Sequence, residues 1–230
     1  MIRFVSLGPG DPELITVKAL KALQSARVVY CPATCEQEGT LQSRAAQIIG
    51  QLPIPREVEL RLFPVPMLSD RQAARRAYEQ VCRELMREQE THPDICVACE
   101  GDAGFYATVH YIYEKLKQDG VSVELIAGVP SFIAAGARAG LHVGHGRRRI
   151  GVIPGTARAA EMEERLRQGE TLVVMKASRC ADEIRRLISL HPEHSYHYFE
   201  RVGYPDELYT HDVEQIIGAG FPYFSLLIIQ

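Results

Sequence analysis

The chain has 230 residues, 46% of them hydrophobic, and a formal net charge of −3. The apolar content is sufficient for one large domain or two smaller ones, whereas the charge leaves no excess of Lys and Arg for a nucleic-acid backbone. The longest apolar stretches are far shorter than the roughly 20 residues of a membrane-spanning helix, and the first residues are typical of a strand rather than a signal peptide. We therefore expect a cytoplasmic, globular protein with neither nucleic acid nor membrane as a partner.

The first half of the chain alternates between strand-like and helix-like patterns of hydrophobic residues. Strands are expected near residues 2–7, 27–31, 57–62, 94–99 and 122–126. Helices are expected between them, near residues 14–24, 41–51, 69–89 and 104–118. Because such alternation is typical of βαβ units, we predict a mostly parallel sheet.

The second half begins with a helix of small residues from Ser131 to Gly140, followed by a Gly/Arg-rich segment from Gly144 to Arg149. Strands are then expected near residues 148–153, 171–176, 195–200 and 223–229, and helices near residues 157–168 and 179–190. The pattern over residues 208–218 favours no single element. We predict an α/β protein with two α/β lobes, residues 1–128 and 129–230, and a cleft between them.

A turn rich in glycine and proline, Gly8-Pro9-Gly10-Asp11-Pro12, follows the first expected strand. In open α/β sheets, ligands bind at the carboxyl ends of strands. A dinucleotide-binding loop needs a third glycine where Glu13 stands, and Pro9 and Pro12 each lack a backbone N–H. The turn therefore disfavours a nicotinamide- or flavin-dependent oxidoreductase and favours another small-molecule enzyme. The alternative is a plain turn without function.

Two further glycine-containing turns follow expected strands. They are Glu100-Gly101-Asp102-Ala103-Gly104 and Ala127-Gly128-Val129-Pro130-Ser131. Because the carboxyl ends of parallel strands share one edge of a sheet, we expect all three turns to line that edge.

Three segments together make the sequence similar to a known family. They are Leu-Gly-Pro-Gly-Asp-Pro-Glu-Leu-Ile-Thr at residues 7–16 with Lys18 after it, Glu-Gly-Asp at residues 100–102 with Phe105 and Tyr106 after it, and Ala-Gly-Val-Pro-Ser-Phe-Ile-Ala-Ala at residues 127–135. On these residues the sequence resembles the tetrapyrrole (corrin and porphyrin) methylases over essentially its whole length. The resemblance implies a methyltransferase that holds S-adenosylmethionine between two α/β lobes, acts on a tetrapyrrole and forms a homodimer.

The resemblance also implies which residues contact the cofactor: Pro9, Glu100, Gly101, Asp102, Phe105, Pro130, Ser131, Met175 and Gly203. An acidic side chain and loop carbonyls suit the ammonium and sulfonium charges of S-adenosylmethionine, while Phe105 and Met175 offer apolar surface to adenine. The sequence departs from the family pattern at Ala103, Ala127 and Pro130. Since Pro130 has neither a backbone N–H nor a hydroxyl, hydrogen bonds there must come from Ser131 or from backbone carbonyls.

Five further segments are similar to family members that methylate C20 of precorrin-2, or of its cobalt complex, on the route to cobalamin: residues 28–32, 43–45, 106–108, 150–156 and 223–227. One alternative is a methylase of the same family that acts at another carbon. A second is a tetrapyrrole carrier without catalytic activity. The sequence leaves open whether the substrate contains cobalt.

A tetrapyrrole substrate carries several carboxylates and needs cationic partners. The candidates are Arg147, Arg148 and Arg149, because guanidinium groups bind carboxylates with two hydrogen bonds; a solvated basic loop is the alternative. Asp11 is the other expected substrate contact. A sulfonium methyl is already activated, so the chain needs chiefly to align it with a carbon nucleophile. Candidates for a base that removes a proton afterwards are Tyr106, His110, His142 and His145.

No metal site is predicted from the sequence. Cys96 and Cys99 have the C-x-x-C spacing of some metal and redox sites, but they lie in an expected strand, where side chains three residues apart point to opposite faces. The same argument applies to His191, His194 and His197, which are also spaced by three. We expect buried structural thiols and no histidine-based metal centre.

Overall fold

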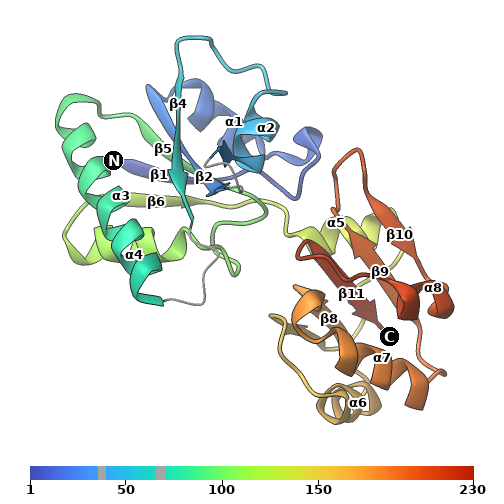
Figure 1. The fold of residues 1–230 in the computed structure, drawn as a ribbon. Coiled ribbons are helices and arrows are strands. Elements are labelled where there is room, and N and C mark those ends of the chain that lie inside the picture. Colours follow the sequence, from blue (N-terminus) through green and yellow to red (C-terminus); the bar gives the residue numbers. More distant parts are fainter. Residues whose placement is uncertain (36–39, 66–70) are drawn as a thin grey trace. The chain divides into compact units, whose positions relative to one another are not determined.

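The structure, a computed structural model, describes residues 1–35, 40–65 and 71–230. It divides into two compact units, unit 1 from Met1 to Pro130 and unit 2 from Ser131 to Gln230. Each unit has its own sheet and its own helices (Figure 1), so the predicted α/β class with two lobes is confirmed. Among the described residues, no helix has both the length and the hydropathy needed to cross a membrane.

The sheet of unit 1 has the strand order β3-β2-β5-β1-β6, and β4 also pairs with β2. The strands are β1 Ile2–Ser6, β2 Val28–Cys35, β3 Leu41–Gln42, β4 Glu59–Pro64, β5 Ile95–Cys99 and β6 Val123–Ile126. All pairs are parallel except that of β2 with the short β3, as the alternation of elements predicted. β5 is buried along its whole length, which is typical of a central parallel strand covered on both faces.

The helices of unit 1 are α1 Val17–Gln24, α2 Arg44–Ile49, α3 Arg71–Thr91 and α4 His110–Gln118, and a short 3-10 helix, η1, covers Pro12–Leu14. Thr16 and Ser43 are the N-caps of α1 and α2, because the side-chain oxygen of each accepts a hydrogen bond from a backbone N–H in the first turn of the helix. α4 begins at His110 rather than near residue 104, because Tyr106 has a positive φ of 51° that interrupts a helix. Residues 69 and 70 of the helix expected over 69–89 lie outside the described residues.

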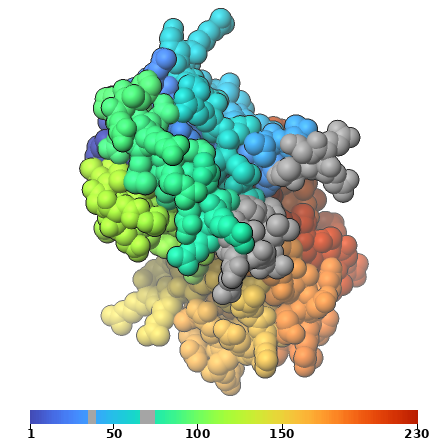
Figure 2. Space-filling view, turned by 60° about the vertical axis from the view of Figure 1, so that its left-hand side comes forward, coloured from blue at the N-terminus to red at the C-terminus, as the bar shows by residue number. Residues whose placement is uncertain are grey.

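One part of the core of unit 1 lies between its sheet and the helices α3 and α4. Leu85 of α3 and Ile112 of α4 are fully buried in one cluster with Phe4 and Val97 of the sheet. In the space-filling view, residues of α3, in green, form part of the outer surface of unit 1 (Figure 2). The helix therefore has one face in the core and one in solvent, as an amphipathic helix on a sheet requires.

The two cysteines of β5 point to opposite faces of the sheet. Cys99 belongs to the cluster beneath α3 and α4, whereas the Sγ of Cys96 lies 3.5 Å from the carbonyl oxygen of Ala22 in α1. Burial raises the pKa of the Cys96 thiol to about 12 and also raises that of Cys99. The predicted strand and its buried thiols are confirmed.

The sheet of unit 2 has the order β10-β9-β11-β8-β7. Its strands are β7 Ile150–Ile153, β8 Thr171–Met175, β9 Tyr196–Glu200, β10 Leu208–Thr210 and β11 Ser225–Ile229. Only β7 and β8 pair in parallel, and the other pairs are antiparallel. β11 lies between β8 and β9, and all of its residues are buried.

The helices of unit 2 are α5 Ser131–Arg138, α6 Ala159–Arg167, α7 Ala181–Leu190 and α8 Val213–Gly218, with a 3-10 helix, η2, over Ala177–Arg179. Residues 208–218, which favoured no single element in the sequence, form β10 and α8. Fully buried Met162 of α6, Ile184 of α7 and Ile216 of α8 pack in one cluster with Tyr198 and Leu227 of the sheet. Three helices therefore share one core with this sheet.

Candidate active site

The three glycine-containing turns lie beside one another at one edge of the unit 1 sheet. They follow β5, β1 and β6, which are adjacent and parallel, so their carboxyl ends meet as predicted (Figure 1). Gly8 and Gly101 exchange two backbone hydrogen bonds, with N···O distances of 3.1 and 2.6 Å. Their φ angles are 80° and 70°, and glycine adopts such angles at little steric cost. These two glycines therefore let the first two turns approach each other closely.

Ser6, the last residue of β1, connects all three turns. Its hydroxyl donates to the carbonyl oxygen of Ile126 at 2.6 Å and accepts from the backbone N–H of Ala103 at 2.8 Å. Ser6 is fully buried, so these bonds replace those that its hydroxyl would make to water. The sequence analysis missed this residue. The available signal is a serine at the carboxyl end of an expected strand, two residues before Gly8.

Asp102 holds the second turn against the third. Its Oδ2 accepts the backbone N–H of Gly128 at 2.6 Å, and its Oδ1 accepts that of Gly104 at 2.8 Å. No side chain fits at Gly128, because a Cβ there would lie 2.4 Å from the Cβ of Ser6 and 2.7 Å from the carbonyl oxygen of Gly101. The close approach of the turns thus depends on a glycine and on a carboxylate.

The edge formed by the three turns is acidic. Residues 8–14, 100–108 and 127–131 contain four carboxylates and no Lys or Arg; the carboxylates are Asp11, Glu13, Glu100 and Asp102. Glu100 is half-buried directly after β5, where solvent screens its charge less. The negative charges of these four side chains attract a cationic ligand and repel a phosphate. The edge therefore suits a ligand with an ammonium or sulfonium group better than a dinucleotide.

An aromatic pair follows the second turn. The rings of Phe105 and Tyr106 meet edge to face, with centroids 4.9 Å apart. Phe105 is half-buried, whereas Tyr106 is 51% exposed. Pro9 in the first turn is buried. Apolar surface thus accompanies the carboxylates of these turns.

Met175 and Gly203 lie at one edge of the unit 2 sheet. β8 and β9 both run antiparallel to β11, and Leu226 of β11 pairs with Met175 on one side and Phe199 on the other. The carboxyl ends of β8 and β9 therefore share an edge, separated by two strand spacings, or about 9.5 Å. Gly203 has a φ of 80°, and its N–H donates to Oε2 of Glu207 at 2.6 Å.

Unusual backbone conformations follow several of these strands. Tyr106, Lys176 and Arg201 have positive φ angles of 51°, 54° and 48°, each of which costs a non-glycine residue roughly 1–2 kcal/mol. Residues with such angles are frequent at ligand sites. Burial, and to a smaller extent the charge of Arg179, lowers the pKa of Lys176. Both units therefore carry strained turns where the sequence predicted cofactor contacts.

Comparison with known proteins decides the family. Residues 1–216 match the family model described as tetrapyrrole (corrin/porphyrin) methylases. The chain belongs to the tetrapyrrole methylases. This membership confirms the family resemblance found in the sequence and the prediction of an S-adenosylmethionine-dependent methyltransferase.

Individual relatives agree with the family match. The precorrin-2 C(20)-methyltransferase of a Sinorhizobium species is 31% identical over 233 residues, which cover 98% of this methylase and 93% of the relative. The cobalt-precorrin-2 C(20)-methyltransferase of Salmonella typhimurium is 30% identical over 186 residues, which cover 80% and 76%. The structure of the uroporphyrin-III C-methyl transferase of Thermus thermophilus, complexed with S-adenyl homocysteine, matches with a TM-score of 0.67 and 21% identity over 99% and 96% of the chains. At this identity the structural likeness shows the fold.

The structure places the candidate bases of this methylase on both units. Tyr106 and His110 are exposed, before and at the start of α4 in unit 1. His142 and His145 are exposed in the segment between α5 and β7 in unit 2. The ring of His110 contacts Tyr111, with centroids 5.8 Å apart. All four side chains are accessible to a ligand, so exposure does not distinguish which of them acts as the base.

The candidate substrate contacts lie in turns. Arg147 and Arg149 are exposed in the segment before β7, and the N–H of Arg148 donates to the carbonyl oxygen of His145 at 3.0 Å. Asp11 is half-buried, and its Oδ1 accepts the N–H of Glu13 at 2.8 Å at the start of η1. Oδ1 of Asp11 is therefore held by the turn itself.

The two remaining predicted cofactor contacts lie where the units divide. Pro130 is the last residue of unit 1, and Ser131 is the first residue of unit 2 and of α5. Both are half-buried. The structural division of the chain thus comes two residues after the boundary expected from the sequence.

One argument from the sequence is wrong. His191 is the C-terminal cap of α7, and His194 lies in the segment before β9, so only His197 is in a strand. The rings of His191 and His194 have centroids 6.1 Å apart. A spacing of three residues does not scatter these two side chains, because a helix end and a loop bring them together.

Proposed function

We propose that this methylase transfers a methyl group from S-adenosylmethionine to C20 of precorrin-2, on the route to cobalamin. Two relatives that align with most of the chain are named for C20 of precorrin-2 or of its cobalt form, which supports this substrate. The observation that supports binding of S-adenosylmethionine is the acidic edge of unit 1, which has four carboxylates and no Lys or Arg in its turns. S-adenosylmethionine is cationic at its sulfonium and ammonium groups, so this edge suits it.

The proposed cofactor contacts of unit 1 are Pro9, Glu100, Gly101, Asp102, Phe105 and Pro130. Half-buried Glu100 attracts the cationic groups, and the ring of Phe105 provides apolar surface. A Cβ added to Gly101 would meet no atom within 4 Å, so there is open space beside this backbone. Asp102 already accepts two backbone N–H bonds, and its main contribution is to hold the turns in place.

The proposed cofactor contacts of unit 2 are Ser131, Met175 and Gly203. The hydroxyl of Ser131 replaces the donor that Pro130 lacks. Half-buried Met175 at the end of β8 offers apolar surface. Because the N–H of Gly203 is bonded to Glu207, Gly203 contributes space and shape rather than a donor.

The chain's part in the reaction is positioning. When bound, S-adenosylmethionine supplies a sulfonium methyl that is already activated toward a carbon nucleophile. The turns fixed by Ser6 and Asp102 keep the ligand contacts in place, so that donor and acceptor are held in line. The acceptor carbon exchanges a proton for the methyl group, and Tyr106, His110, His142 and His145 are the candidates to receive that proton.

We assign recognition of the substrate carboxylates to Arg147, Arg148 and Arg149. Guanidinium groups bind carboxylates through paired, charge-assisted hydrogen bonds. The segment begins with Gly144-His145-Gly146, whose glycines allow its backbone to adapt to a bulky ring system. Asp11 is the other proposed substrate contact; as a carboxylate that already accepts the N–H of Glu13, it can accept only from donor groups of the substrate, such as pyrrole N–H groups, and not bind its carboxylates.

The experiment that tests the substrate is incubation with methyl-labelled S-adenosylmethionine and either precorrin-2 or its cobalt complex, followed by NMR of the product. A labelled methyl at C20 is expected. A label at another carbon would mean that the chain is a methylase of the same family that acts at a different ring position. Comparison of the two substrates decides whether cobalt is inserted before this step.

The cofactor site is tested by calorimetric titration with S-adenosylhomocysteine. Glu100→Gln removes one charge partner of the ligand ammonium, so we expect the Kd to rise roughly tenfold. Glu90→Gln, at an exposed position of α3, is the matched control and should leave the Kd unchanged. A protein that binds precorrin-2 but not S-adenosylhomocysteine would instead be a carrier.

Assembly and location complete the proposal. We propose a homodimer in the cytoplasm, on the family resemblance of the sequence. Light scattering after size exclusion should give twice the chain mass of 25.7 kDa. A single-chain mass at the working concentration would contradict the dimer, and fractionation of cells decides the location.

A further inference from the structure

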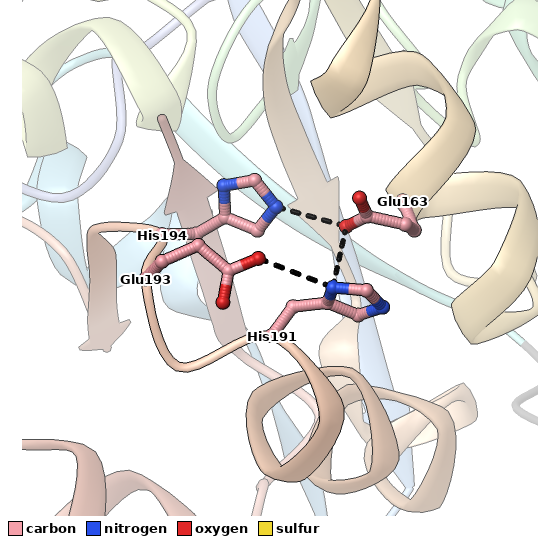
Figure 3. Close-up of side chains that lie close together, drawn as sticks. All are labelled: Glu163, His191, Glu193 and His194. Atoms are coloured by element: carbon pink, nitrogen blue, oxygen red, sulfur yellow. Dashed lines mark hydrogen bonds and ion pairs between the residues drawn. The ribbon is translucent and has the colours of Figure 1, made fainter.

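A second cluster of functional side chains lies in unit 2, at the edge of the sheet opposite Met175 and Gly203. It contains Glu163 of α6, His191 at the end of α7, and Glu193 and His194 in the segment that leads into β9 (Figure 3). One ligand atom from each residue lies within 4.8 Å of the others. The methyl transfer proposed above uses none of these residues.

The ligand atoms lie within 4.8 Å of one another, and two of their separations are close to those in a tetrahedral metal site. Nε2 of His194 lies 2.8 Å from Oε2 of Glu163, and Nδ1 of His191 lies 3.4 Å from the same oxygen and 3.2 Å from Oε1 of Glu193. Bonds of about 2.0–2.1 Å to a tetrahedral Zn²⁺ place neighbouring ligand atoms roughly 3.3–3.4 Å apart. Small side-chain rotations are therefore sufficient to surround an ion.

The backbone that carries the two histidines is well supported. The hydroxyl of buried Tyr196 donates to the carbonyl oxygen of His191 at 2.8 Å, and the N–H of His191 donates to Leu187 at 2.9 Å. Ser195 exchanges two backbone hydrogen bonds with Gln230, at 2.9 and 3.0 Å. Because the loop is fixed on both sides, little ordering is needed when an ion binds.

The donor set selects the kind of ion. Two imidazole nitrogens and two carboxylate oxygens suit Zn²⁺ and similar divalent transition metals, whereas Mg²⁺ and Ca²⁺ prefer oxygen alone. The two carboxylates together balance the charge of a divalent ion. A groove of about 640 Å³ between α6 and α7 is lined by Glu163 and His191 among others, so an ion can reach the cluster from solvent.

We propose that Glu163, His191, Glu193 and His194 bind one Zn²⁺ or similar divalent transition-metal ion. Four protein ligands leave no coordination position for a substrate, which is typical of a structural site. The ion joins α6 to the segment between α7 and β9. It therefore stabilises unit 2 and takes no part in methyl transfer.

Titration of the full chain with Zn²⁺, by calorimetry and by thermal unfolding, tests the site. We expect saturable binding of one ion per chain and a higher Tm, since a ligand that binds the folded state stabilises it. Glu163→Gln and His194→Gln each remove a direct ligand and should weaken binding by at least roughly tenfold, the loss typical even of outer-shell partners. Glu164→Gln, one residue along α6, and His211→Gln should bind as the original chain does, because neither residue belongs to the cluster.

X-ray absorption of the zinc-loaded original chain tests the ligands without relying on a variant that folds. Nitrogen and oxygen neighbours at about 2.0–2.1 Å are expected, and sulfur at about 2.3 Å would place the ion on cysteine. Sulfur ligation would overturn the proposal. So would the absence of saturable binding, or unchanged affinity in both ligand variants with a native circular-dichroism spectrum.

Discussion

The strand ends of the two sheets are organised differently. In unit 1, the strands that precede the three turns are neighbours and parallel, and Ser6 and Asp102 bond one turn to the next. In unit 2, antiparallel β11 separates Met175 from the turn that contains Gly203. Parallel neighbours thus bring successive loops into contact, whereas a mixed sheet brings them only to the same edge. We therefore expect single substitutions to disturb ligand binding more at the unit 1 edge.

The largest effect is expected for Gly128→Ala. The new Cβ would lie 2.4 Å from the Cβ of Ser6, and overpacking of this kind costs about 3 kcal/mol of unfolding free energy. Because the turns must separate, binding of S-adenosylhomocysteine should be lost. Urea denaturation and calorimetric titration measure the two effects. Gly218→Ala, where an added Cβ would meet no atom within 4 Å, is the control, and equal behaviour of the two variants would contradict the packing argument.

Ser6→Ala tests the connection between the turns with no added volume. It leaves the buried N–H of Ala103 without the hydroxyl that accepts it at 2.8 Å, which costs about 1–2 kcal/mol of unfolding free energy. Binding of S-adenosylhomocysteine should weaken without being abolished. Ser25→Ala, which removes a hydroxyl that donates to Ala22 at the end of α1, should leave ligand binding unchanged. A normal Kd for Ser6→Ala would mean that the turns keep their arrangement without it.

A triple variant in which Arg147, Arg148 and Arg149 are all replaced by Ala tests the contribution of unit 2 to substrate binding. The KM for the tetrapyrrole should rise roughly tenfold, because charge-assisted bonds to carboxylates are lost. The Kd for S-adenosylhomocysteine should not change. The matched control replaces three exposed arginines of α3, Arg76, Arg83 and Arg87. An unchanged KM in the first variant would make the basic segment a solvated loop.

The effect that is smallest near neutral pH, where these thiols are protonated in both the folded and the unfolded chain, is a loss of stability in alkali. Burial raises the pKa of the Cys31 and Cys96 thiols in unit 1 from 9.0 to about 12. Between these values the thiols ionise in the unfolded chain and not in the folded one, so the free energy of unfolding falls as the pH rises above about 9. The double variant Cys31→Ala and Cys96→Ala should flatten this decrease in urea denaturation series. Equal pH slopes for the variant and the original chain would contradict it.

Local patterns predicted the unit 1 edge, because each turn directly follows a strand in the sequence. The contacts between the turns were not predictable in the same way. Ser6 bonds to Ile126, a residue 120 positions away, and this pairing depends on β6 lying next to β1. The contact of His191 with His194 was missed for a different reason, since it depends on where α7 ends. Sequence patterns therefore located the three glycine-containing turns but not the hydrogen bonds that hold them.

The central position of β11 has a consequence for protein synthesis. β7 and β8 pair with each other, and so do β9 and β10, but β8 and β9 are connected only through β11. During synthesis the two strand pairs precede residues 225–229, so they lack the strand that connects them until that strand has left the ribosome. Unit 1 is complete in sequence about 100 residues earlier, and domains generally fold as units during translation. We therefore expect ribosome-bound chains stalled before residue 225 to carry a folded unit 1 and a protease-sensitive unit 2.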